Sequence, residues 1–79
     1  MTIDYEVNIR IELESEEIAR LLFISVYPDM KIKNHDLMSD IKLEKNIVSL
    51  TIKSTSLSRL RGVLNSFIRV YKMVRDIII

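Results

Sequence analysis

The last part of the chain carries an apolar pattern that is typical of a helix and wider than one small core requires. Between residues 56 and 79, apolar side chains recur at the spacing of one helix face, at Leu57, Leu60, Leu64, Ile68 and Tyr71. At about 100° per residue, a second row lies beside the first, at Val63, Phe67, Val70, Val74 and Ile77. Together the rows cover about half of the helix, whereas one core usually takes a stripe of about 100°. The pattern predicts a long helix whose surplus apolar surface meets another chain.

The beginning of the chain alternates between apolar and polar residues without a break from residue 3 to residue 13. A period of two over this length predicts a strand with one buried face and one solvated face. Two further strands are predicted over residues 37–45 and 47–54. We expect residues 44–46 to form the hairpin turn between them, because Asn46 tolerates the left-handed backbone that such turns use.

A helix is predicted between the first two strands. Ser15 has the side chain of an N-cap, and two glutamates follow it in the first turn, where the helix dipole favours anions. Pro28 disfavours the helical region for the residue before it, so we expect the helix to end near Tyr27. The expected inward stripe comprises Ile18, Leu21, Leu22 and Ser25, widened by Ala19, Phe23 and Val26.

The predicted elements follow in the order β-α-β-β-α, and Thr55 or Ser56 caps the last helix. We therefore predict one α+β domain over residues 1–79, with a three-stranded antiparallel sheet and two helices packed on one face. The same order occurs in small RNA-binding folds of the KH type. A KH domain needs a GXXG loop, however, and the only glycine of this chain is Gly62.

Composition narrows the function classes without selecting one. The chain has no cysteine and a single histidine, His35, so we expect no disulfide, no metal site and no cofactor. A domain of this size is only marginally stable alone, and association with other chains is a common remedy. No basic region followed by an apolar run precedes the first strand, and no apolar segment approaches the length of a membrane span. A cytoplasmic location fits these features.

The residues offer little support for catalysis. The chain lacks a glycine-rich phosphate loop, since Gly62 stands alone. His35 beside Asp36 could act as a base with its orienting carboxylate, but a solvated loop explains the pair equally simply. We therefore predict that the protein is not an enzyme and has no catalytic residue.

Binding is the better-supported class. Arg61, Arg69 and Lys72 lie along the polar part of the last helix, where they either contact RNA phosphates or form a solvated face. A set of apolar helix residues either completes the core of this domain or contacts a second copy or another protein: Ala19, Phe23, Val63, Phe67, Val70 and Val74. Whether two sheets would join edge to edge or helices would pair stays open.

The last helix also resembles the C-terminal signature of the Pcc family (CTAG/Pcc), the small dimerising subunit of the KEOPS complex. That signature has a Leu-Arg pair, then Leu-Asn-Ser, then an apolar and a basic residue, matched here by Leu60-Arg61, Leu64-Asn65-Ser66 and Ile68-Arg69. Upstream, the helix that ends in Val26-Tyr27-Pro28-Asp29 is similar to the short helix of the family that closes on Pro-Asp. The resemblance spans nearly the whole chain, apart from residues 35–40.

The resemblance implies a scaffold role. Members of the family are not enzymes; they dimerise and join two copies of the catalytic ATPase-fold subunit, whose helices pack on those of the small subunit. The complex makes threonylcarbamoyladenosine in tRNA, and the small subunit is thought to help hold the tRNA. The resemblance thus implies a homodimer in the cytoplasm that binds the catalytic subunit. A paralogous second small subunit, known from archaea, and a stand-alone RNA-binding module remain alternatives.

Overall fold

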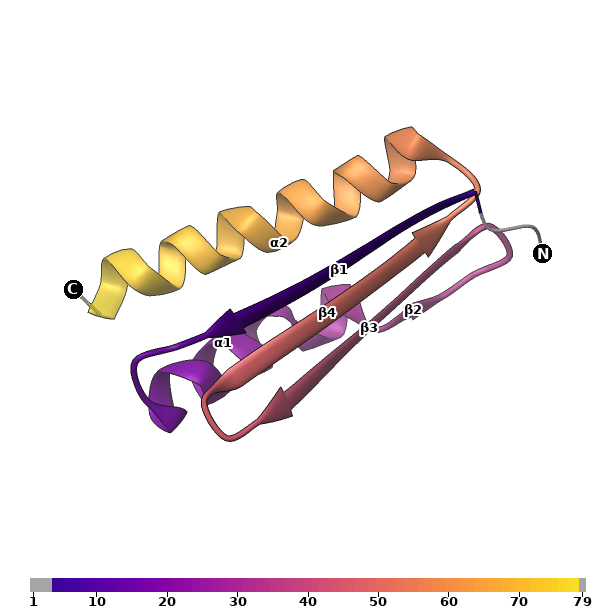
Figure 1. Cartoon of the computed structure of the whole chain (residues 1–79). Helices are drawn as coiled ribbons and strands as arrows, with labels where there is room; N and C mark the ends of the chain where they lie inside the picture. Colours follow the sequence, from indigo (N-terminus) through magenta and orange to yellow (C-terminus); the bar gives the residue numbers. More distant parts are fainter. Residues whose placement is uncertain (1–3, 79) are drawn as a thin grey trace.

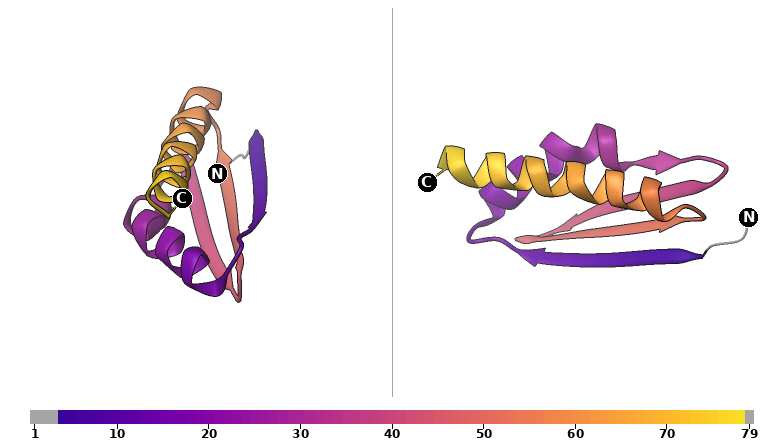
Figure 2. Two further views of the ribbon diagram at one scale, coloured as in Figure 1. Left: turned by 90° about the vertical axis from the view of Figure 1, so that its left-hand side faces the viewer. Right: turned by 90° about the horizontal axis from the view of Figure 1, so that it is seen from above.

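The computed structural model describes residues 4–78 and shows a sheet of four strands with two helices on one face (Figures 1 and 2). The elements are β1 (Tyr5–Glu12), α1 (Glu16–Met30), β2 (Ile32–Lys33), β3 (Leu37–Glu44), β4 (Ile47–Ser54) and α2 (Leu57–Ile78). The strand order is β1-β4-β3-β2, and every neighbouring pair is antiparallel. The predicted α+β class and the packing of both helices on one face are confirmed.

The predicted number of strands is wrong, because the structure adds β2 to the three expected strands. Ile32 pairs with Ser39, and Lys33 pairs with Met38. A strand of two residues is too short to show alternation, so a period of two could not reveal it. Strand β1 agrees with the prediction over Tyr5–Glu12, whereas Ile3 lies outside the described residues.

Helix α1 starts as predicted but continues beyond the expected end. The Ser15 hydroxyl accepts a hydrogen bond from the Ile18 amide at 3.2 Å, which confirms the N-cap. Pro28 lies inside the helix, and the amide of Lys31 donates to the Tyr27 carbonyl at 3.1 Å. Pro28 is exposed, so water can bind the carbonyl that the missing proline N–H leaves without a donor. The expected end near Tyr27 is therefore wrong.

The two helices turn different rows toward the sheet than the pattern suggested. The buried row of α1 consists of Ala19, Leu22, Val26 and Met30, and that of α2 consists of Leu60, Phe67 and Val74. Leu21 is 42% exposed, and the Ser25 hydroxyl donates to the Leu21 carbonyl at 2.7 Å. The prediction that these two residues point inward is therefore wrong. The apolar arc of each helix contains two rows, and only tertiary packing selects one of them.

The β3–β4 hairpin differs from the prediction in one residue and fixes the end of β1. Lys45, not Asn46, takes the left-handed backbone, with φ of 57°. The side-chain amide of Asn46 instead donates to the Leu13 carbonyl at 2.8 Å, and the Leu13 amide donates to the Asn46 carbonyl at 2.8 Å. These two bonds attach the end of β1 to the hairpin.

The start of α2 is fixed by side-chain hydrogen bonds around the end of β4. The amide of Ser56 donates to the Ser54 hydroxyl at 2.9 Å, and this hydroxyl donates to the Asp36 carbonyl at 3.1 Å. The Ser56 hydroxyl accepts from the Arg59 amide at 3.4 Å, so Ser56 rather than Thr55 serves as the cap. The Arg59 guanidinium also lies 2.6 Å from the Asp36 carboxylate. The direction of α2 across the sheet is therefore set at its first turn.

Phe67 provides a test of the core. Because its ring is 1% exposed, the change Phe67→Ala leaves a cavity between α2 and the sheet. We expect the free energy of unfolding to fall by about 3–5 kcal/mol, measured by urea denaturation. The matched change Ile24→Ala, at a side chain that is 61% exposed, should alter it by less than about 0.5 kcal/mol. Equal losses from the two variants would contradict this placement of Phe67.

Candidate interaction surface

Strand β1 extends beyond the helices, so its inner face is incompletely covered. Viewed along the sheet, α2 lies over β4, while β1 stands at the far edge (Figure 2). The inner residues of β4, Val48, Leu50 and Ile52, are at most 1% exposed. On β1, by contrast, Tyr5 is 41% exposed, and the other inner residues are only half-buried: Val7, Ile9 and Ile11. Strand β1, one of the two end strands of the sheet, thus presents apolar side chains that the chain itself buries only in part.

The flank of α2 nearest to β1 continues this apolar surface. Gly62 and Ser66 lie on the side of α2 that faces α1, since they line a groove with Asp29 and Met30. At about 100° per residue, the opposite flank carries Leu57, Leu64, Ile68 and Tyr71. Leu57 is 47% exposed and Ile68 38%. We call the combined surface the β1–α2 face; it consists of Tyr5, Val7, Ile9, Ile11, Leu57, Leu64, Ile68 and Tyr71.

A second apolar surface lies on the outer side of α1. Ile24 is 61% exposed, and Tyr27 and Leu21 are each 42% exposed. The rings of Phe23 and Tyr27 pack against each other with centroids 5.2 Å apart. A shallow hollow is lined by Phe23, Ile24, Tyr27 and Pro28. We call Leu21, Phe23, Ile24, Tyr27 and Pro28 the α1 patch. It lies on a different part of the surface from the β1–α2 face.

Of the predicted interface residues, some lie in the core of the single chain and the others lie half-buried near its surface. Ala19, Phe67 and Val74 are at most 5% exposed in the core of the single chain, so they have no surface to offer a partner. This burial corrects their assignment to an interface. Phe23 lies half-buried in the α1 patch, and Val63 and Val70 lie half-buried beside the core.

The family motif combines core and surface positions on α2. Leu60 is buried and Leu64 is half-buried, whereas Arg61 and Asn65 are exposed and Ser66 is half-buried. The predicted RNA-contacting residues Arg61, Arg69 and Lys72 are all exposed on the side of α2 that faces away from the core. Among the described residues, none of these three forms an ion pair with an acidic side chain. We call Arg61, Arg69 and Lys72 the basic stripe.

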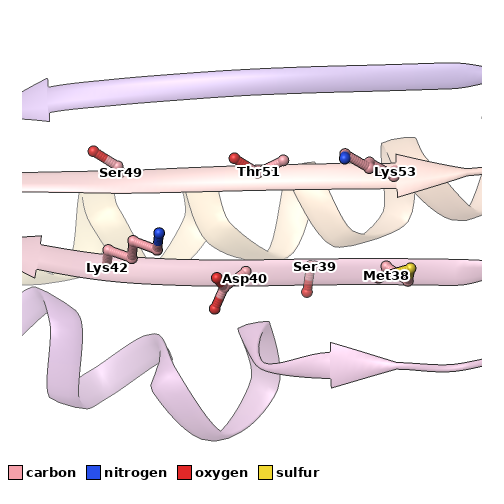
Figure 3. Close-up of a pocket in the computed structure, with 7 residues that line it drawn as sticks. All are labelled: Met38, Ser39, Asp40, Lys42, Ser49, Thr51 and Lys53. Atoms are coloured by element: carbon pink, nitrogen blue, oxygen red, sulfur yellow. The ribbon is translucent and has the colours of Figure 1, made fainter.

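The uncovered face of the sheet is polar and its charges are mixed. A depression on this face is lined by side chains of β3 and β4 (Figure 3): Met38, Ser39, Asp40, Lys42, Ser49, Thr51 and Lys53. Asp40 accepts a hydrogen bond from Lys31, which lowers the pKa of the carboxyl and raises the pKa of the amine. The hydroxyl of Ser39 donates to the Met30 carbonyl instead of entering the depression. Among the residues that line the depression, no serine or threonine is hydrogen-bonded to a basic side chain.

The loop that carries His35 does not form the base and orienter pair considered above. The Asp36 carboxylate contacts Arg59 at 2.6 Å, and His35 is exposed. Within residues 4–78, no group of three or more histidine or acidic side chains could hold a metal ion. None of the helices in this part of the chain is long and apolar enough to span a membrane.

These features define a small α+β domain with an apolar face along one sheet edge and one helix. The sequence model of the family described as "Transcription factor Pcc1" matches residues 6–78, and the chain therefore belongs to the Pcc1 family. A chain in the "Crystal structure of binary complex Gon7-Pcc1" has the same fold, with a TM-score of 0.80 and 25% sequence identity. The match covers 98% of this chain and 95% of that chain. No curated protein matches this chain. The resemblance to the Pcc family is confirmed.

Sequence reasoning missed the contribution of β1 to the surface. Tyr5, Val7, Ile9 and Ile11 were expected to face a core, and they do point toward the helices. Their exposure arises because β1 is one of the two end strands and α2 lies over β4. The unbroken alternation shows which face of a strand is apolar, but it carries no information on whether a helix reaches that strand.

Gly62 gives a test of the surface near α1. A methyl group added at Gly62 would meet no atom within 4 Å, and the residue lies inside α2. Since glycine inside a helix costs about 1 kcal/mol relative to alanine, we expect Gly62→Ala to raise the free energy of unfolding of the isolated protein by about that amount. Urea denaturation measures the change. A loss of stability would contradict the open surroundings of Gly62.

Proposed function

We propose that this chain is a non-catalytic scaffold subunit of the KEOPS complex, which makes threonylcarbamoyladenosine in tRNA. In this role it forms a homodimer that bridges two copies of the catalytic ATPase-fold subunit. The observation that carries the proposal is the β1–α2 face, an apolar surface that the fold itself leaves uncovered. Membership of the Pcc1 family supports it.

A second copy of the chain suits the β1–α2 face for two reasons. The face is apolar at both the strand and the helix, as are the centres of homodimer interfaces. A twofold dimer also places the same surface of each copy against the other, so one apolar face suffices for both. Burying these side chains adds apolar contact to a domain that is too small to be very stable alone.

The α1 patch is a suitable contact site for the catalytic subunit. It lies away from the β1–α2 face, so each copy in a dimer still presents Ile24 and Tyr27 to solvent. A twofold dimer therefore carries two equivalent α1 patches, one for each catalytic subunit. The solved neighbour gives a precedent for assembly, since it is a binary complex of Gon7 and Pcc1.

The basic stripe supports a contact with tRNA inside the complex. Its three cations are exposed and lie in a row along α2. Contacts to phosphate oxygens need no base recognition, and they weaken as salt rises. The same stripe favours a second candidate function, a stand-alone RNA-binding module. That module would bind tRNA without other subunits.

Two aspartate substitutions separate the dimer from the contact with the catalytic subunit. Ile68→Asp places a charge in the β1–α2 face and should raise the dimer dissociation constant by at least about tenfold, measured by sedimentation equilibrium. It should leave capture of the catalytic subunit intact. Ile24→Asp, in the α1 patch, should do the reverse. A dimer unaffected by Ile68→Asp would contradict the proposed surface, and unchanged capture by Ile24→Asp would remove the α1 patch from the bridge.

Charge reversal tests the role in RNA binding. The double change Arg69→Glu with Lys72→Glu should weaken tRNA binding by the assembled complex and reduce its salt dependence by about two phosphate contacts. Fluorescence anisotropy at several salt concentrations measures both quantities. Lys42→Glu, on the uncovered face of the sheet, is the matched control and should have little effect. Equal binding by the double variant and the wild type would exclude the basic stripe, and strong tRNA binding by the chain alone would favour the second candidate.

A further inference from the structure

We propose that the face of the sheet opposite the helices holds a binding site for a small phosphate monoester, formed by Arg10, Ser49 and Lys42. The inference goes beyond the proposed scaffold role and does not depend on it. Three observations carry it: these residues form one row across three strands, their polar groups have no partner within the described chain, and a depression lies beside them.

The three residues stand side by side on neighbouring strands. Ser49 of β4 is opposite Arg10 of β1 on one side and opposite Lys42 of β3 on the other. Lys42 and Ser49 line the depression of Figure 3, and Arg10 alternates with the apolar inner residues of β1, so all three side chains lie on the same face. Neighbouring strands are about 4.8 Å apart, which places the two cations about 10 Å apart at the backbone. We call the three residues the donor row.

The polar groups of the next row on this face already bind one another. Thr51 stands opposite Asn8 on β1 and opposite Asp40 on β3. The Thr51 hydroxyl donates to the Asn8 side-chain oxygen at 3.0 Å, and Asp40 accepts a hydrogen bond from Lys31. The hydrogen-bonding groups of this second row are therefore engaged within the chain.

The donor row differs, because its side chains have no such partners. Within residues 4–78, its two cations form no ion pair and its hydroxyl makes no hydrogen bond. Glu12 and Glu44 lie one row further along the face, opposite Ile47, and neither pairs with these cations. A guanidinium, an ammonium and a hydroxyl all donate hydrogen bonds. The row thus presents three donor groups and two positive charges to one ligand.

A phosphate monoester matches the donor row in charge and in oxygen atoms. It carries nearly two negative charges at neutral pH and three strong acceptor oxygens. Hydrogen bonds between such oxygens and a guanidinium or ammonium are short and strong, and a guanidinium binds two of the oxygens at once. A carboxylate and the phosphodiester of an RNA backbone each carry a single negative charge. Both therefore match this pair of cations less well.

The depression provides space for the organic part of the ligand. Its volume of about 430 Å³ lies within the range of small-molecule sites. It continues from Lys42 and Ser49 along β3 and β4 to Met38, whose side chain offers an apolar contact (Figure 3). The site lies on the opposite side of the sheet from the α1 patch and from the helix part of the β1–α2 face. It therefore stays accessible in the proposed assembly.

Titration of the ¹⁵N-labelled full chain tests the site, with amide shifts followed by two-dimensional NMR at constant ionic strength. The probes are adenosine monophosphate, inorganic phosphate and acetate. We expect saturable shifts at Arg10, Ser49 and Lys42, with adenosine monophosphate binding several-fold tighter than inorganic phosphate because the depression contacts its organic part. Equal affinity for these two probes would overturn the role of the depression. Equal shifts with acetate, or no shifts in the donor row, would overturn the site itself.

Two substitutions of equal charge change separate the donor row from general attraction of anions. Lys42→Gln should raise the dissociation constant of adenosine monophosphate by about tenfold or more, because a charged hydrogen bond is lost. Lys72→Gln, in the basic stripe on α2, is the matched control and should change it by less than about twofold. Equal weakening by both variants, or none by Lys42→Gln, would overturn the proposal. A loss of tRNA binding in the Lys42→Glu control described above would assign the row to RNA instead and would also overturn it. None of these results bears on the dimer.

Discussion

The structure depends on a mismatch between the width of the sheet and the reach of its two helices. α2 covers β4 and α1 packs beside it, which completes the core around Phe67 and the inner row of β4. β1 lies one strand further out, and its inner side chains are only partly buried. Burial of apolar surface is the main driving force of folding and association, so a face of this kind favours another chain. The proposed dimer follows from this uncovered face.

Local hydrogen bonds fix the positions of β1 and α2 relative to the rest of the sheet. Leu13 and Asn46 exchange bonds at one end of β1, which prevents the strand from moving away from β4. At the other end of the sheet, Ser54, Ser56 and Asp36 fix the first turn of α2. Neither β1 nor α2 can shift to cover the other without breaking these bonds, each worth about 1 kcal/mol. The partial exposure of the inner face of β1 is therefore a stable feature of the fold.

The sequence predicted the elements well because their patterns are local. β1, β3 and β4 alternate over eight residues each, and the Ser15 cap marks the start of α1. Prediction from the sequence failed for features that depend on the packing of several segments against one another. The choice between two apolar rows on each helix, and hence the burial of Phe67, depends on where the sheet lies. The pairing of Ile32 and Lys33 with β3 depends on the end of α1 and leaves no period to detect.

The sequence predicted that an uncovered apolar surface exists, but not which residues form it. The width of the apolar arc on α2 correctly indicated more apolar surface than the chain covers, since Leu57 and Ile68 are exposed. It could not show that Ala19 and Val74 are buried or that β1 supplies half of the face. Both facts follow from the strand order, which places β1 at the edge, and sequence periodicity carries no information on strand order.

Amide hydrogen exchange along β1, compared at high and low protein concentration, tests the central claim most directly. The account predicts that the amides of β1 exchange more slowly once two copies associate, because the second copy covers the β1–α2 face and makes local opening of the strand less frequent. Equally fast exchange of these amides at both concentrations would show that no second copy covers this face, and it would contradict the account.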